Sequence, residues 1–222
     1  MSGEPFKKSV AREYFESLVI AVVLALFIRT FVVQAFKIPT GSMEPNLLIG
    51  DHLLVNKLVF GPTVSSVERT LLPMKDIARG DVVVFKYPED PERDFIKRVI
   101  GLPGEQIEVR QKRVYVGGAL LDEPYAFYIE QPPPVPREIE PAGDRQGLSG
   151  DPRENYGPVT VPPKHYFVMG DNRDNSQDSR YWGFLPRDYV KGRALVIYWS
   201  YEAETGNLVT GTRWGRLLHQ VR

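Results

Sequence analysis

The stretch DFIKRVIGLPGE, from Asp94 to Glu105, carries a strand pattern from which the fold of the chain can be argued. Its first part is rich in β-branched and apolar residues, and a Gly-Leu-Pro-Gly turn closes it. Because successive side chains of a strand point to opposite faces, Lys97 shares one face with Phe95 and Val99, and Arg98 lies on the other. We therefore expect one of these two cations to lie on an apolar face of a sheet.

Short stretches of the same kind recur on both sides of it, most of them bounded by Gly, Pro or Asp. They are GDHLLVNKLVF (Gly50–Phe60), GDVVVFKY (Gly80–Tyr87), EQIEVR (Glu105–Arg110), RVYVGG (Arg113–Gly118), HYFVMGD (His165–Asp171) and ALVIYWS (Ala194–Ser200). The chain has 222 residues, and its 19 glycines and 19 prolines supply turns between these stretches. This pattern predicts a mainly β body, a coiled sheet or sandwich rather than a βαβ fold.

The composition changes between residues 111 and 163, where proline, glycine and charged residues become frequent. The run QPPPVPREIEPAGDRQGLSGDPREN is the densest part of this segment. We expect an insertion with little core of its own, a smaller β subdomain that carries a long loop.

The N-terminal region contains the longest apolar run, LVIAVVLALFI, from Leu18 to Ile28. Extended to residues 14–36, it is about 23 residues long, and a helix of that length spans roughly 30 Å, the thickness of bilayer hydrocarbon. We predict a tail at 1–13, a transmembrane anchor at 14–36 and the body at 37–222. Basic residues before the anchor favour, weakly, a cytoplasmic N-terminus.

Two alternatives remain for this segment. Val33-Gln34-Ala35 has small residues at the spacing of a signal-peptide cleavage site, although Arg29 interrupts the apolar core that such a peptide needs. A buried core helix is the other alternative, and the uninterrupted apolar run argues against it.

Charge and cysteine content exclude several classes of function. The 28 basic and 28 acidic residues balance, so no global field favours a nucleic-acid partner. The chain has no cysteine, which excludes disulfides, thiol nucleophiles, zinc–thiolate sites and iron–sulfur clusters.

The stretch KIPTGSMEPN, from Lys37 to Asn46, places Ser42 between two prolines directly after the anchor. A linker is one interpretation and a nucleophile is the other. The surroundings are not those of a Gly-x-Ser-x-Gly elbow. The chain has three histidines, and nothing in the sequence marks any of them as the base of a triad.

Lys97 is a second candidate for chemistry. Burial favours the neutral amine, and a fall of its pKa from about 10.4 to about 8 costs ~3 kcal/mol of lost charge solvation. The neutral amine would be a general base near neutral pH. The alternative is a lysine that extends to solvent at a sheet edge.

The third candidate is GDNRDNSQDSRYWGFLP, from Gly170 to Pro186, a polar loop after a strand. A calcium loop is disfavoured because Ser179 and Leu185 stand where glycine and glutamate are expected. A solvated loop and a self-bonded loop remain, the latter with Asp178 paired to Arg180 and with a serine near a buried amine.

Together, the motifs PTGSMEP, GDHLLVNK, KRVIGLPGE and GDNRDNSQDSRYWG, in this order after an apolar segment, resemble those of the type I signal peptidase family. The members are membrane-bound Ser/Lys proteases that cut signal peptides from exported proteins. The resemblance implies a mainly β protein in which a single transmembrane helix precedes a coiled antiparallel β-sheet catalytic domain with an inserted smaller β subdomain.

The resemblance also implies roles for individual residues. Ser42 matches the nucleophile and Lys97 the general base, while Thr40 and the Ser42 backbone N–H match the oxyanion hole. Ser176 matches a serine that bonds the lysine. No metal or other cofactor is implied.

Further matches are structural or concern the substrate. Asp178 and Arg180 match an ion pair beneath the site. Two small pockets of the family accept small side chains, typically alanine, one and three residues before the cut bond. Their matching positions are Phe36, Ile38, Met43, Leu47, Leu53, Val84, Phe95 and Ile96.

For location and partners, the resemblance implies a single-pass protein of the plasma membrane with an extracytoplasmic catalytic domain. Its partners would be signal peptides of exported preproteins and membrane lipid, with the secretion machinery nearby and no nucleic acid. The chain departs from the family at Asn46, where threonine is usual, and at Thr40, where many members have serine. We expect a local effect from Asn46. Thr40 keeps the hydroxyl, but its extra methyl restricts χ1, and a donor fixed in this way could help or hinder the oxyanion.

Two other functions remain possible on the sequence alone. Self-cleaving repressors use Ser and Lys on a related β fold, but they carry a DNA-binding helical domain for which this sequence has no pattern. A membrane-anchored β domain without turnover that binds extended peptides is the other, and intact Ser42, Lys97 and Ser176 argue against it.

Overall fold

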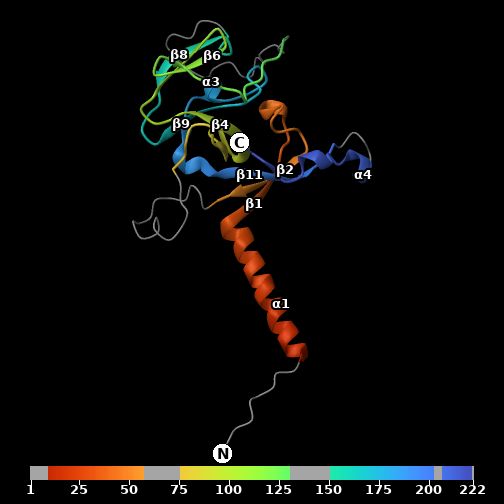
Figure 1. Cartoon of the computed structure of the whole chain (residues 1–222). Coiled ribbons are helices and arrows are strands. Elements are labelled where there is room, and N and C mark those ends of the chain that lie inside the picture. The colour runs from red at the N-terminus through yellow and green to blue at the C-terminus, as the bar shows by residue number, and fades with distance from the viewer. Residues whose placement is uncertain (1–9, 58–75, 131–150, 203–206, 222) are drawn as a thin grey trace, which may run out of the picture.

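The computed structural model describes residues 10–57, 76–130, 151–202 and 207–221. A long helix, α1, projects from a β body, and the small sheet with β6 and β8 lies at the opposite end of that body (Figure 1). Within these described ranges, the body contains one eight-stranded sheet and one four-stranded sheet. The mainly β fold predicted from the strand pattern is therefore confirmed.

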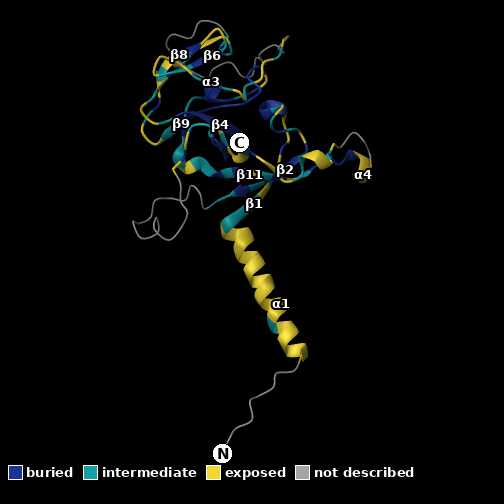
Figure 2. Ribbon diagram, viewed as in Figure 1, coloured by how far each residue is buried: buried dark blue, intermediate teal, exposed yellow. Residues whose placement is uncertain are grey.

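The N-terminal helix consists of α1, Val10–Phe27, continued by the π-helical turn η1, Ile28–Val32. None of its residues is buried, and Figure 2 shows it exposed almost throughout. The apolar helix Val10–Val32 is 23 residues long, enough to cross a membrane. An apolar surface of this size is suited to lipid rather than water.

The helical segment differs in its bounds from the predicted anchor at 14–36. Helix begins at Val10, and the last predicted residues belong to β1, Val33–Lys37. These residues are extended because they pair with β2, with Phe36 opposite Leu53. An apolar run without a break does not reveal where helical bonding gives way to sheet bonding.

The large sheet is antiparallel and has the order β1-β2-β11-β3-β4-β9-β10, with β12 paired to β11. Its remaining strands are β2 Asp51–Asn56, β3 Val82–Tyr87, β4 Asp90–Gly101, β9 His165–Met169, β10 Leu185–Pro186, β11 Val190–Ser200 and β12 His219–Gln220. The short helical turns are η2 Gly41–Met43, α3 Ser179–Trp182, η4 Arg187–Tyr189, α4 Leu208–Gly211 and η6 Trp214–Arg216.

The small sheet has the order β7-β6-β5-β8, and all its pairs are antiparallel. Its strands are β5 Gln106–Arg110, β6 Arg113–Val116, β7 Ala119–Leu120 and β8 Asn155–Thr160. The sheet begins with β5, before the predicted boundary at residue 111, because β5 pairs with β6 and β8. Residues 131–150 of the predicted loop lie outside the described residues.

Strand β4 contributes to each of the three apolar clusters formed by the described residues. Ile96 packs into the cluster around β1, β2 and β11, Val99 into that of β3 and β9, and Ile100 into that of the small sheet. Both Lys97 and Arg98 are buried, with 3% and 2% exposure. The strand pattern predicted that one of these cations would lie on an apolar face; both are enclosed, because both faces of β4 are covered.

Candidate active site

Ser42 lies in the helical turn η2, between β1 and β2, and is 7% exposed. Its carbonyl oxygen accepts a hydrogen bond from the Asn172 backbone N–H at 3.1 Å. The Asn172 side chain donates to the carbonyl oxygen of Gly41 at 3.2 Å. The loop after β9 therefore holds the turn that carries the serine.

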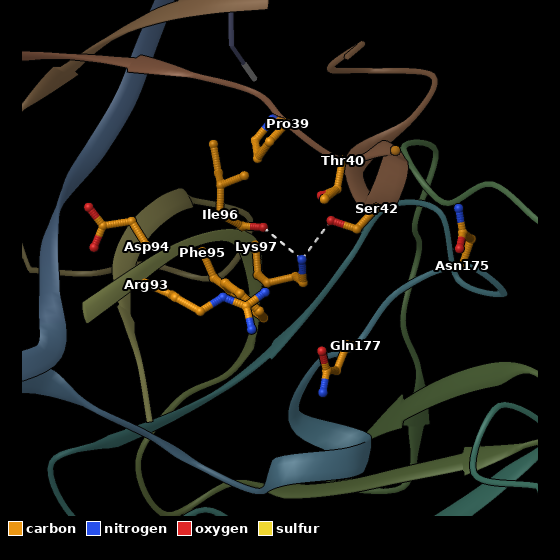
Figure 3. Close-up of a pocket in the computed structure, with 11 residues that line it drawn as sticks. Pro39, Thr40, Ser42, Arg93, Asp94, Phe95, Ile96, Lys97, Asn175 and Gln177 are labelled. Carbon is orange, nitrogen blue, oxygen red and sulfur yellow. Dashed lines mark hydrogen bonds between the residues drawn. The ribbon is translucent and has the colours of Figure 1, made fainter. Parts of the chain in front are cut away.

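Lys97 reaches this serine from the middle of β4. Its Nζ donates to Ser42 Oγ at 2.6 Å and to the Ile96 carbonyl oxygen at 3.0 Å (Figure 3). It also lies 5.3 Å from the centre of the Phe95 ring. The two residues predicted to form a dyad are thus in direct contact, although 55 positions separate them in the chain.

The environment of Lys97 weakens its hold on a proton. Burial lowers the pKa of Lys97 to about 8, against the opposing effect of the carboxylates of Asp178 and Asp171, while Arg180 lowers it further. The amine is therefore half neutral near the upper end of the physiological pH range. A neutral amine has a lone pair that can accept the proton of the Ser42 hydroxyl.

Within the described residues, no histidine forms a hydrogen bond with Ser42. The hydroxyl oxygen of Ser42 is occupied by Lys97, while His52 and His165 lie in β2 and β9 and His219 lies in β12. The His52 ring packs edge-on against Tyr198. The pair Ser42–Lys97 is thus the nucleophile–base arrangement that the geometry offers.

A cavity of about 400 Å³ opens beside this pair. Thr40 lies at its edge next to Ser42, and both the Thr40 and Pro39 side chains are exposed (Figure 3). Backbone and side chains from η2, β4 and the loop after β9 enclose it. They belong to Pro39, Thr40, Gly41, Ser42, Arg93, Asp94, Phe95, Ile96, Lys97, Asn175 and Gln177.

The positions matched to substrate pockets divide into two groups. Phe95 and Ile96 line the cavity beside Ser42, and Ile96 also belongs to the apolar cluster of β1, β2 and β11. The others pack behind it in one apolar cluster, in which Phe36 is partly buried. That cluster contains Ile38, Met43, Leu47, Leu53 and Val84.

Ser176 lies next to Ser42 across Gly170. A side-chain carbon added to Gly170 would lie 2.3 Å from Ser176 Oγ and 2.4 Å from the Ser42 carbonyl oxygen. The Ser176 hydroxyl is buried and forms no hydrogen bond of standard geometry with the described residues. The structure therefore brings Ser176 beside the pair, but the expected bond to Lys97 is not among the bonds of Nζ to described residues.

Asp178 and Arg180 form an ion pair with two hydrogen bonds, each 2.8 Å long, and neither side chain is more than 1% exposed. Burial alone would raise the pKa of Asp178, but the charge and hydrogen bonds of Arg180 hold that pKa below its usual range. Arg180 also donates to the Arg173 carbonyl oxygen at 2.7 Å. The pair thus stiffens the loop that holds η2.

Sequence patterns missed a second buried ion pair, between Arg98 and Asp171, with bonds of 2.7 and 2.6 Å. Asn46 donates to Asp171 Oδ2 at 2.9 Å and to the Tyr125 carbonyl oxygen at 2.8 Å. An amide has two N–H donors where threonine has one hydroxyl proton, so Asn46 serves both acceptors. The position of Arg98 beside Lys97 in β4 was the signal available in the sequence.

Comparison with known proteins shows which family the sequence resembles. The sequence model of a family described as signal peptidase, peptidase S26, matches residues 11–199. Signal peptidase I of Pseudomonas aeruginosa is 36% identical over 97% of this chain and 81% of its own length. Probable signal peptidase I-2 of Synechocystis sp. is 40% identical over 84% and 72%, respectively.

Signal peptidase I of Aquifex aeolicus is 36% identical over 85% of this chain and 84% of its own length. A solved signal peptidase I from Enterococcus faecalis is 31% identical and covers 54% of this chain and 97% of its own. Its TM-score of 0.39 is too low to support a comparison of folds. From the family match and these sequence identities, the chain belongs to the signal peptidase I family, the serine peptidases of family S26.

Proposed function

We propose that this chain uses Ser42 and Lys97 as a catalytic dyad to remove signal peptides from exported preproteins. The observation that carries the proposal is the 2.6 Å contact between Lys97 Nζ and Ser42 Oγ in a cavity wall. The lowered pKa of Lys97 and the family membership of the chain support it.

The first chemical step is attack by the serine. Neutral Lys97 takes the hydroxyl proton while Ser42 Oγ forms a bond to the scissile carbonyl carbon, and the carbonyl electron pair moves to its oxygen. A base already in contact with the hydroxyl loses little entropy in reaching the transition state.

The negative oxygen that forms needs donors. The Ser42 backbone N–H is suited to this, because the first N–H groups of a helical turn have no partner within it. The Thr40 hydroxyl, at the edge of the same cavity, is the second donor that we propose. Losing one such donor typically costs about 3 kcal/mol of transition-state stabilisation.

The remaining steps return the enzyme to its starting state. The protonated Lys97 gives its proton to the leaving amine as the carbon–nitrogen bond breaks, which leaves an acyl ester on Ser42. A water molecule, activated by the again neutral lysine, then hydrolyses the ester. No step requires a metal or an organic cofactor.

Substrate selection follows from the cavity wall next to the serine. Phe95 and Ile96 present apolar surface there, and Pro39 lines the same cavity (Figure 3). We propose that small side chains such as alanine, one and three residues before the cut bond, fit against this surface. Larger side chains would displace the packed cluster behind it.

We further propose that the helix Val10–Val32 anchors the chain in the plasma membrane with its N-terminus in the cytoplasm. Ser42 follows this helix after β1 alone, so it would lie close to the outer face of the bilayer. The cleavage site of a signal peptide, itself a membrane segment, emerges at the same surface.

The test is cleavage of a preprotein by the purified chain in detergent. We expect Ser42→Ala and Lys97→Ala each to abolish cleavage, because one removes the nucleophile and the other its base. Circular dichroism should show that both variants stay folded. Full activity of a folded Lys97→Ala variant would refute the dyad.

A further inference from the structure

Gln177 is a polar side chain of the cavity wall to which the proposed reaction gives no part. It lies in the loop between β9 and α3, and it lines the same cavity as Ser42 and Lys97. In Figure 3 its amide oxygen points toward the pair and its amide nitrogen points away.

A chain of hydrogen bonds fixes this orientation. The Tyr87 hydroxyl bonds to a carboxyl oxygen of Glu89, and Gln177 Nε2 lies 3.2 Å from the same hydroxyl oxygen. A carboxylate only accepts, so the single proton of the phenol goes to Glu89 and the phenol oxygen accepts from Gln177. The amide nitrogen must therefore face Tyr87, which leaves Oε1 facing the cavity.

The anchor of the amide is itself rigid. Tyr87 is buried, and its ring stacks on that of Phe95 with centres 4.3 Å apart and planes 7° from parallel. Burial and the bond to Glu89 raise the pKa of Tyr87, so its hydroxyl keeps the proton throughout the working pH range. Since Phe95 also lines the cavity, the amide and this wall form one packed unit.

Within the described part of the chain, Gln177 Oε1 forms no hydrogen bond. A fixed acceptor in a substrate cavity requires a donor, and the donor common to all peptides is the backbone N–H. We propose that Gln177 Oε1 accepts a hydrogen bond from one backbone N–H of the substrate, and that Tyr87 holds the amide in the orientation required. This proposal rests on the proposed function, because it concerns the peptide bound beside Ser42.

The test pairs an enzyme variant with a substrate that lacks one N–H. Peptides spanning a signal-peptide cleavage site are made with one backbone amide at a time replaced by an ester, and the scissile amide is kept. With the unaltered enzyme, one ester position should lower kcat/KM by about five- to tenfold, the usual effect of one hydrogen bond. The full-length chain in detergent is used throughout.

Gln177→Ala should slow the all-amide peptide by about the same factor, and the penalty at that ester position should disappear. Tyr87→Phe, which keeps the ring, should reduce the penalty without removing it, because the amide can then turn over. Gln106→Ala, an exposed position in the small sheet, is the matched control and should leave every rate unchanged.

The outcomes separate this proposal from the proposed function. Equal ester penalties in the unaltered enzyme and in Gln177→Ala overturn the role of Gln177, whatever the absolute rates. Cleavage by Ser42→Ala at the unaltered rate overturns the dyad instead. Gln177→Ala could also stay folded and bind every peptide as tightly as before, yet lose all activity. That result would overturn the role as well, because the loss of one substrate hydrogen bond cannot account for it.

Discussion

Lys97 shows how one residue can be both costly and useful. Its burial lowers its pKa to about 8, and the same burial places Nζ against the Ser42 hydroxyl. The parity argument on β4 identified this residue in the sequence. It could not reveal that Arg98 would be enclosed as well, because the partner of Arg98, Asp171, comes from a distant loop.

The dependence of activity on pH follows from that pKa. Because only neutral Lys97 can take the proton, kcat/KM should rise about tenfold per unit below about pH 7 and level off above about pH 9. A profile of initial rates on one preprotein measures this. A midpoint near 10.5, the ordinary value for lysine, would mean that the working base is not buried.

The same pKa predicts a gain in stability on removing the charge. Below pH 8 Lys97 is protonated in both folded and unfolded chains, and a shift from 10.5 to about 8 corresponds to about 3 kcal/mol of lost stability. Lys97→Met should therefore be inactive but more stable at pH 7.

This gain should shrink as the pH rises from about 8 to about 10.5, where the folded protein no longer carries the proton, and it should vanish above that range. Urea denaturation at several pH values measures it, with Lys86→Met, at an exposed position of β3, as the control. A gain independent of pH would point to packing alone.

Thr40 is the residue-scale test of the oxyanion hole. Thr40→Val keeps the shape of the side chain and removes its hydroxyl, so kcat should fall by about 10²-fold with KM little changed. Thr40→Ser retains the donor and should retain most activity. Equal turnover by the valine and serine variants would remove Thr40 from the mechanism.

At the scale of elements, strand patterns predicted much of the sheet and left out what depends on pairing. Each predicted strand has a counterpart among the described residues, from β2 to β11. Two of the longer strands were not predicted. Strand β1 was merged with the helix because both are apolar, and β8 contains Pro158 and lies in a proline-rich segment. The two-residue strands β7, β10 and β12 are too short to show any periodicity.

The cavity wall was less accessible to sequence reasoning than the dyad. Arg93 shares the parity of Phe95 and Lys97 on β4, so alternation could have found it. Asn175 and Gln177 lie in a loop, where side-chain direction follows from individual hydrogen bonds and has no period. Matched motif positions, for their part, did not distinguish Phe95 in the wall from Leu53 in the core.

The loop between β9 and α3 depends on its buried ion pair. Arg180→Met leaves the Asp178 carboxylate buried without its partner, which should cost about 3–5 kcal/mol at pH 7. Because Arg180 holds the pKa of Asp178 below 3.8, its contribution is present above that pH and is lost as the pH falls below it.

Urea denaturation measures this cost. Adding Asp178→Asn to Arg180→Met removes the lone charge and should recover a large part of the loss. If Arg180→Met alone is as stable to urea as the unaltered chain, the ion pair contributes nothing to the stability of the protein.

At the scale of the whole molecule, the N-terminal helix packs separately from the β body. No residue of α1 or η1 is buried, whereas β1 pairs with β2 along its whole length. Removing residues 1–32 should therefore leave the body folded and able to cleave a short peptide, while binding to lipid vesicles falls.

Removing residues 1–37 is the matched comparison, because it also deletes β1 and exposes the edge of β2. This shorter chain should be less stable to urea and less active on the same peptide. Vesicle sedimentation and peptide assays separate the two effects. Equal stability of the two truncated chains would contradict the role of β1 in the sheet.

The hydrogen bond from Asn172 to Gly41 joins residues 131 positions apart. A ribosome makes Ser42 early and the loop that fixes its turn much later. During synthesis, the nascent chain therefore contains Ser42 for an interval before Asn172, which bonds to the turn that carries this serine, has been made. We therefore expect the proposed dyad to be inactive until Asn172 and its loop have been added to the growing chain.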